Sequence, residues 1–163
     1  MKRYRIAHVG AFDFENYGDL LFVDVFEKTI RKYVDVEEIV LFAPKRCKMP
    51  FSNEEREVCS ITELEKKNLE NSFDAIVVGG GDLVHCSKIR TYMPHISPEW
   101  VDYEVLYMWM IPSIISWKYN IPLLWNAPGV PLKFINSEKT PPKTKICFGA
   151  AVLFKMPMFD LIA

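Results

Sequence analysis

The fold is decided by residues 74–82, which read DAIVVGGGD. Ala75 to Val78 form a continuous apolar run that follows an aspartate and stops at three glycines. An apolar run without polar alternation is typical of a parallel strand that is buried on both faces of a sheet. A glycine turn at the carboxyl end of such a strand exposes backbone N–H groups to an anionic ligand. The stretch therefore predicts a central parallel strand with a ligand site at its end.

A second glycine-bearing turn follows the first apolar run of the chain. Residues 4–9 predict a strand, and residues 20–33 predict an amphipathic helix because apolar residues recur at spacings of four. The turn NYGD lies between them at residues 16–19. Carboxyl ends of parallel strands meet at one edge of a sheet, so we expect both glycine turns at the same edge.

The rest of the pattern alternates between strands and helices. Further strands are predicted over residues 36–42 and 121–125, and a long helix over 97–119 that Pro112 kinks or divides. The charged segment over 51–71 is expected to contain a short surface helix. In that segment Ser60 and Glu63 have the spacing of a helix capping box. The alternation predicts an α/β protein with a three-layer, Rossmann-like domain and a mainly parallel sheet.

Composition limits the kind of partner. The chain has 163 residues, of which 50% are apolar, and a formal net charge of −1, which offers no general attraction for nucleic acid. Its four cysteines lie far apart with no Cys-x-x-Cys pair, so we expect reduced thiols and no metal site. The apolar runs are too short for a secretory signal or a membrane span. A cytoplasmic location is therefore expected.

Four segments, taken in order, resemble the polysaccharide pyruvyl transferase family. They read HVGAF at residues 8–12, NYGD at 16–19, DAIVVGGGDL at 74–83 and WNAPGV at 125–130. Members of that family transfer a pyruvyl group from phosphoenolpyruvate to a sugar hydroxyl of a cell-envelope polysaccharide or its precursor. The resemblance implies a fold like the amino-terminal half of a B-type glycosyltransferase, with phosphoenolpyruvate as donor substrate and no cofactor.

The resemblance covers one domain of the family. It implies a domain over residues 1–135, followed by an atypical tail over 136–163 that is either truncated or packed on the domain. The family's Arg-Asp-x-x-Ser segment has no counterpart here, and no arginine or histidine follows His95. We therefore expect the chain to supply only the acceptor-side domain. The alternatives are a non-catalytic sugar- or nucleotide-binding accessory domain and, less favoured without a Gly-x-Gly-x-x-Gly turn after the first strand, a nucleotide-dependent oxidoreductase.

The candidate catalytic residues are Asp82 and His85, which lie three positions apart and so on one face if a helix follows the glycines. The alternatives are a helix N-cap for the aspartate and a structural role for the histidine. His8, inside the first strand, is interpreted as a hydrogen-bonded core residue. The candidate acceptor-binding residues are Asn16, Tyr17, Gly18, Asp19, Gly79, Gly80, Gly81 and Asn126. Helix capping, packing and turn formation are the competing roles for these positions.

The expected partners are a sugar or lipid-linked glycan acceptor, and phosphoenolpyruvate if a second domain is present. The aromatic residues Tyr103, Tyr107, Trp109 and Trp117 are interpreted first as the packed side of a long helix. Contact with a polyprenyl carrier at the inner face of a membrane is the alternative interpretation.

Overall fold

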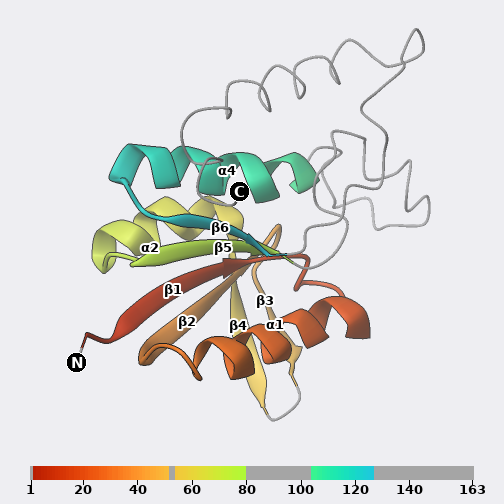
Figure 1. The fold of residues 1–163 in the computed structure, drawn as a ribbon. Helices are drawn as coiled ribbons and strands as arrows, with labels where there is room; N and C mark the ends of the chain where they lie inside the picture. The colour runs from red at the N-terminus through yellow and green to blue at the C-terminus, as the bar shows by residue number, and fades with distance from the viewer. Residues whose placement is uncertain (1, 52–53, 80–103, 127–163) are drawn as a thin grey trace, which may run out of the picture.

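The computed structural model describes residues 2–51, 54–79 and 104–126, which form one α/β unit (Figure 1). In chain order the elements are β1 (Tyr4–Val9), α1 (Tyr17–Ile30), β2 (Val36–Ala43), β3 (Cys47–Pro50), β4 (Glu55–Ser60), the short 3-10 helix η1 (Ile61–Glu63), α2 (Leu64–Glu70), β5 (Ala75–Gly79), α4 (Glu104–Tyr119) and β6 (Leu123–Asn126).

The strands form a six-stranded sheet in the order β3-β4-β2-β1-β5-β6. All neighbouring pairs are parallel except β3 with β4, which is antiparallel. The strand order grows outward in both directions from the β1–β5 pair, so the direction of winding reverses there. This arrangement is compatible with the Rossmann-like class that the sequence predicts.

Helices cover both faces of the sheet. Figure 1 shows α1 on one side and α2 with α4 on the other. Val23 and Phe26 of α1 pack against Ile6 and Leu41 on one face. On the opposite face, α2 and α4 contribute Leu64, Met108 and Ile115 to a cluster with Ala7, Val9, Ile76 and Val78. Successive residues of β1 therefore point to opposite cores, as the alternation of a strand requires.

The predicted strands over 4–9, 36–42, 75–78 and 121–125 are confirmed by β1, β2, β5 and β6, within a few residues at their ends. The capping box is also confirmed, because the Ser60 N–H donates to the Glu63 carboxylate at 3.1 Å and the Ser60 side chain caps η1.

Three predictions about the elements were wrong. Strands β3 and β4 were missed, because the first three residues of β4 are charged and only Val58 and Cys59 turn into the core. Helix α1 begins at Tyr17 instead of Leu20, since Asn16 and not a later residue is its N-cap. Pro112 does not divide α4, which is continuous from Glu104 to Tyr119, whereas a kink at Pro112, the other predicted outcome, stays a prediction. Residues 97–103 of that predicted helix lie outside the described residues.

His8 sits in the middle of the sheet as a neutral imidazole. The side chain is 0% exposed and lies against the rings of Phe12 and Phe26, with centroid separations of 5.0 and 4.6 Å. Burial, reinforced by the positive charge of Arg56, lowers its pKa from 6.5 to about 3. Between these two values the unfolded chain binds a proton that the folded chain excludes, so the free energy of unfolding falls as the pH decreases from 6.5.

Replacing His8 by Leu should remove this acid sensitivity. The free energy of unfolding of His8→Leu, relative to wild type, should grow by up to about 1.4 kcal/mol for each pH unit below the unfolded pKa. Urea denaturation followed by circular dichroism between neutral and mildly acidic pH measures the difference. Parallel pH profiles for the two proteins would show that His8 is not held neutral by the fold.

Candidate functional site

The carboxyl ends of β1, β5 and β6 meet at one edge of the sheet. Val9 pairs with Val78, and Gly79 pairs with Asn126 at the end of β6. Gly10, the residue after β1, donates its N–H to the Phe42 carbonyl at 3.0 Å and so continues the β1–β2 pairing. In an open parallel sheet, ligands bind outside the carboxyl ends of the strands where the winding direction reverses. We call the ends of these three strands, with the start of α1, the carboxyl-edge site.

Gly10 and Gly79 are glycines because neighbouring groups fill the space of a side chain. A Cβ at Gly10 would lie 2.7 Å from the Gly79 carbonyl oxygen and would collide with the Phe12 ring. A Cβ at Gly79 would collide with the backbone carbonyl of Asn126. The backbones of neighbouring strands therefore approach each other more closely at this edge than residues with a Cβ atom allow.

The start of α1 belongs to the same edge through the loop that follows β1. The Asn16 side-chain oxygen accepts the Gly18 N–H at 3.1 Å, and the Asn16 amide donates to the Asp19 carboxylate at 2.8 Å. Asn16 therefore caps the helix, which was one of its two predicted roles. Tyr17 is 77% exposed, so it is not packed in the core and its ring is available to a ligand.

The structure brings together only part of the predicted site. Gly79 and Asn126 are neighbours, and Asn16 to Asp19 form the first turn of α1 with its cap. Gly80, Gly81, Asp82 and His85 lie outside the described residues, so their predicted roles in catalysis and binding stay predictions.

The aromatic residues of α4 divide between core and surface. Trp109 is buried, as the packing interpretation expects, but Tyr107 is 42% and Trp117 76% exposed, so for these two that interpretation was wrong. Tyr103 lies outside the described residues. Among the helices that the structure describes, none is long and apolar enough to cross a membrane.

Within the described ranges, no group of three or more His, Cys, Asp or Glu side chains could hold a metal ion. Cys47 and Cys59 are free thiols, and burial, with a smaller effect of Asp13, raises the pKa of Cys47 to about 11. Cys47 is therefore a neutral thiol at pH 7.

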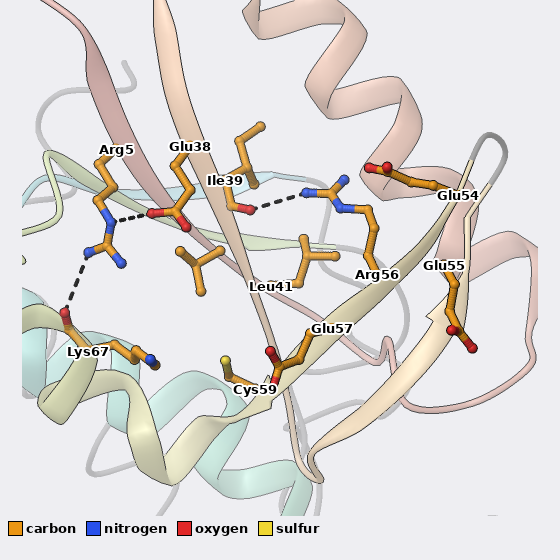
Figure 2. Close-up of a pocket in the computed structure, with 11 residues that line it drawn as sticks. Arg5, Glu38, Ile39, Leu41, Glu54, Glu55, Arg56, Glu57, Cys59 and Lys67 are labelled. Atoms are coloured by element: carbon orange, nitrogen blue, oxygen red, sulfur yellow. Dashed lines mark hydrogen bonds and ion pairs between the residues drawn. The ribbon is translucent and has the colours of Figure 1, made fainter.

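A polar hollow of about 310 Å³ lies away from this edge, beside the amino-terminal half of β2 (Figure 2). It forms because β4 pairs with β2 only from Leu41 and Val58 onward, so the two strands diverge before that point. Arg56 of β4 spans the gap by donating to the Ile39 carbonyl at 3.2 Å, while its other terminal nitrogen contacts Glu27 at 2.8 Å.

Arg5 closes the other side of the hollow. Its guanidinium donates to Glu38 at 2.6 Å and to the backbone carbonyl of Asn71 at the end of α2, and it stacks 4.2 Å from the centroid of Phe73. Figure 2 shows this side chain directed between Glu38 and the Lys67 carbonyl. Both arginines of the hollow thus donate to protein acceptors. Arg56 bonds to β2 where the strand pairing is missing, and Arg5 bonds to the backbone at the end of α2.

The sequence did not reveal how His8 and Phe12, on either side of Gly10, contact each other. His8 is a core residue as expected, but the expectation that it is hydrogen-bonded was wrong: neither ring nitrogen has a partner in the described part of the chain. A histidine among the apolar residues Ile6, Ala7 and Val9, shortly before a glycine, is the sequence signal that could have singled it out.

Together, the fold and the site define an α/β protein with a mainly parallel six-stranded sheet and a candidate ligand site at the carboxyl ends of its strands. A scan against protein-family models, a search of curated proteins and a search of solved structures each gave no match to the chain.

Two glycine substitutions should separate the crowded edge from the open helix start. Gly79→Ala should lower the free energy of unfolding by about 2 kcal/mol or more, because the new methyl group meets the Asn126 backbone. Gly18→Ala should be neutral or stabilise by up to about 1 kcal/mol, because Ala favours a helix and only the Asn16 side-chain oxygen, at 3.5 Å, is near. Urea denaturation measures both, and equal effects would contradict the described packing of β5 against β6.

Proposed function

We propose that the chain binds a sugar or nucleotide-sugar at the carboxyl-edge site and acts as the acceptor-side domain of a polysaccharide pyruvyl transferase-like enzyme. The observation that carries the proposal is the close approach of Gly10, Gly79 and Asn126 at the point where the winding direction reverses. Two of the segments that carry the family resemblance, HVGAF and WNAPGV, begin at or near this edge, and the described part of DAIVVGGGDL runs along β5 and reaches the edge at Gly79.

The described groups at the edge suit a hydroxyl-bearing ligand. Asp19 carries a carboxylate that can accept a hydrogen bond from a sugar hydroxyl, and Asn16 holds that carboxylate in place. The first turn of α1 adds the positive end of a helix dipole, which favours a phosphate group. The exposed ring of Tyr17 offers an apolar surface to the face of a sugar.

Pyruvyl transfer needs more than this edge supplies. Ketal formation requires an acid to protonate the enol carbon of phosphoenolpyruvate, a base near the acceptor hydroxyl, and cations for the phosphate and carboxylate. The resemblance implies that basic residues and a histidine in the second half of the family pattern hold phosphoenolpyruvate, and no arginine or histidine follows His95 here. Complete transfer therefore requires a second domain. The same absence favours the alternative proposal, a non-catalytic sugar- or nucleotide-binding accessory domain.

The acceptor proposal is tested by titrating the chain with UDP-glucose in a calorimeter. Asp19→Ala should weaken binding about tenfold, because the hydroxyl loses a charged acceptor. Asp24→Ala, farther along α1 and away from its first turn, is the matched control and should leave binding unchanged. Equal loss in both variants, or no binding by wild type, would contradict the proposal.

Catalysis is tested separately. Incubation of the purified chain with phosphoenolpyruvate and UDP-glucose should give no pyruvylated sugar by mass spectrometry, while binding persists. Turnover by the chain alone would contradict its assignment as an acceptor-side domain.

A further inference from the structure

His8 is an unsatisfied polar group in the most buried part of the protein. It is 0% exposed, and within the described residues neither nitrogen donates or accepts a hydrogen bond. An unpaired buried polar group costs about 1–3 kcal/mol. Leucine or phenylalanine would fill the same place on β1 without that penalty, so the imidazole calls for a role other than packing.

Phe12, whose side chain is also 0% exposed, lies between His8 and the end of β1. Its ring meets the imidazole edge-on, at 5.0 Å between centroids and an interplanar angle of 68°. The same ring lies where a side chain at Gly10 would be, directly at the end of β1. Phe12 therefore contacts the edge on one side and His8 on the other.

The backbone around Phe12 is not part of the sheet. Phe12 follows β1 in the loop that leads to α1, and its carbonyl is contacted by the Cys47 thiol at 4.0 Å, a weak donor. The loop is attached on either side of Phe12 by the Gly10 N–H and by the Asp13 carboxylate, which accepts the Lys45 N–H at 3.0 Å. Displacement of the ring therefore breaks no strand hydrogen bond, but the Phe12 side chain is 0% exposed and belongs to the core cluster on the α1 face, so the packing around it must open locally.

We propose that His8 is a hydroxyl-binding residue of the carboxyl-edge site and that Phe12 covers its imidazole until a ligand displaces the ring. The proposal rests on the proposed function of this edge and names one more residue that meets the ligand. A neutral imidazole has one N–H donor and one acceptor nitrogen, which match a sugar hydroxyl that both accepts and donates. Burial and the nearby charge of Arg56 keep the ring neutral, so it offers no charge to a phosphate.

The uncovering of His8 can be measured without any ligand. Diethyl pyrocarbonate modifies accessible neutral histidines, and the tryptic peptide from Ile6 to Lys28 contains His8 as its single histidine. Alkylation of Cys59, buried in the core on the other face, reports global unfolding in the same sample. Each rate is normalised to that of the urea-unfolded protein. Wild-type His8 should react faster than Cys59, because local opening is easier than global unfolding.

Two matched variants locate the cover. Phe12→Leu should raise the ratio of His8 to Cys59 reactivity about tenfold, because a smaller side chain covers the ring less completely. Phe26→Leu changes the other ring that contacts His8, but from α1, and should leave the ratio near that of wild type. Equal protection of His8 and Cys59 in wild type, or equal ratios in the two variants, would overturn the proposal.

A ligand arm separates this inference from the function of the edge. UDP-glucose should slow the modification of His8 in Phe12→Leu, whereas inorganic pyrophosphate, which has no sugar hydroxyl, should not. If UDP-glucose binds in the calorimeter but gives no protection, the inference about His8 fails while the proposed function stands. If it does not bind at all, the proposed function fails, whatever the labelling of His8 shows.

Discussion

The pairing of β1 with β5 is the constraint on which the rest of the molecule depends. β1 leads through α1 to β2, which lies next to it on one side in the sheet. β5 follows later in the chain and lies on the other side of β1, where β6 extends the sheet in the opposite direction. Asp74 fixes the start of this pair, since its carboxylate accepts the Arg5 N–H at 2.9 Å and its own N–H donates to the Arg5 carbonyl at 2.8 Å. At the other end of the pair, the strands converge on Gly10 and Gly79. The place where the winding reverses is thus also a place where two glycine backbones lie in close contact with their neighbours.

Strand β1 holds two buried polar side chains, of which one is hydrogen-bonded and the other is not. Arg5 is enclosed by a carboxylate, two backbone carbonyls and an aromatic ring, so its charge is compensated and its position is explained by the fold. His8, three residues on and on the opposite face, is enclosed by aromatic rings that offer no hydrogen bond in the plane of the imidazole. A buried polar group with hydrogen-bond partners stabilises the one conformation in which those partners are in place. A buried polar group without partners lowers the stability of every conformation that keeps it away from water. The unpaired His8 in the carboxyl-terminal half of β1 therefore lowers the stability of the fold, and this half of the strand leads to the candidate site.

The sequence predicted the parts of the fold in which local pattern and burial agree. The uninterrupted run from Ala75 to Val78 lies between two strands and two helical layers, so every residue is apolar and the strand is evident. β4 escaped prediction because Arg56 and Glu57 serve contacts at the margin of the sheet, with Glu27 and Arg46 respectively, and such pairs are invisible in a linear pattern. The glycine positions of the edge were predictable, but the reason for them was not, since it depends on contacts between strands far apart in sequence. The lack of hydrogen-bond partners for His8 could not be predicted either, because the sequence does not show that the neighbours of His8 are Phe12 and Phe26.

We propose that ligands bind this protein where β1, β5 and the start of α1 converge. Backbone amide chemical shifts, recorded by NMR during titration with UDP-glucose, test it most directly. Among the described residues, we expect the largest shifts at Gly10, Gly79, Asn126 and the first turn of α1. Largest shifts around Arg5, Glu38 and Arg56, at the polar hollow beside β2, would contradict it.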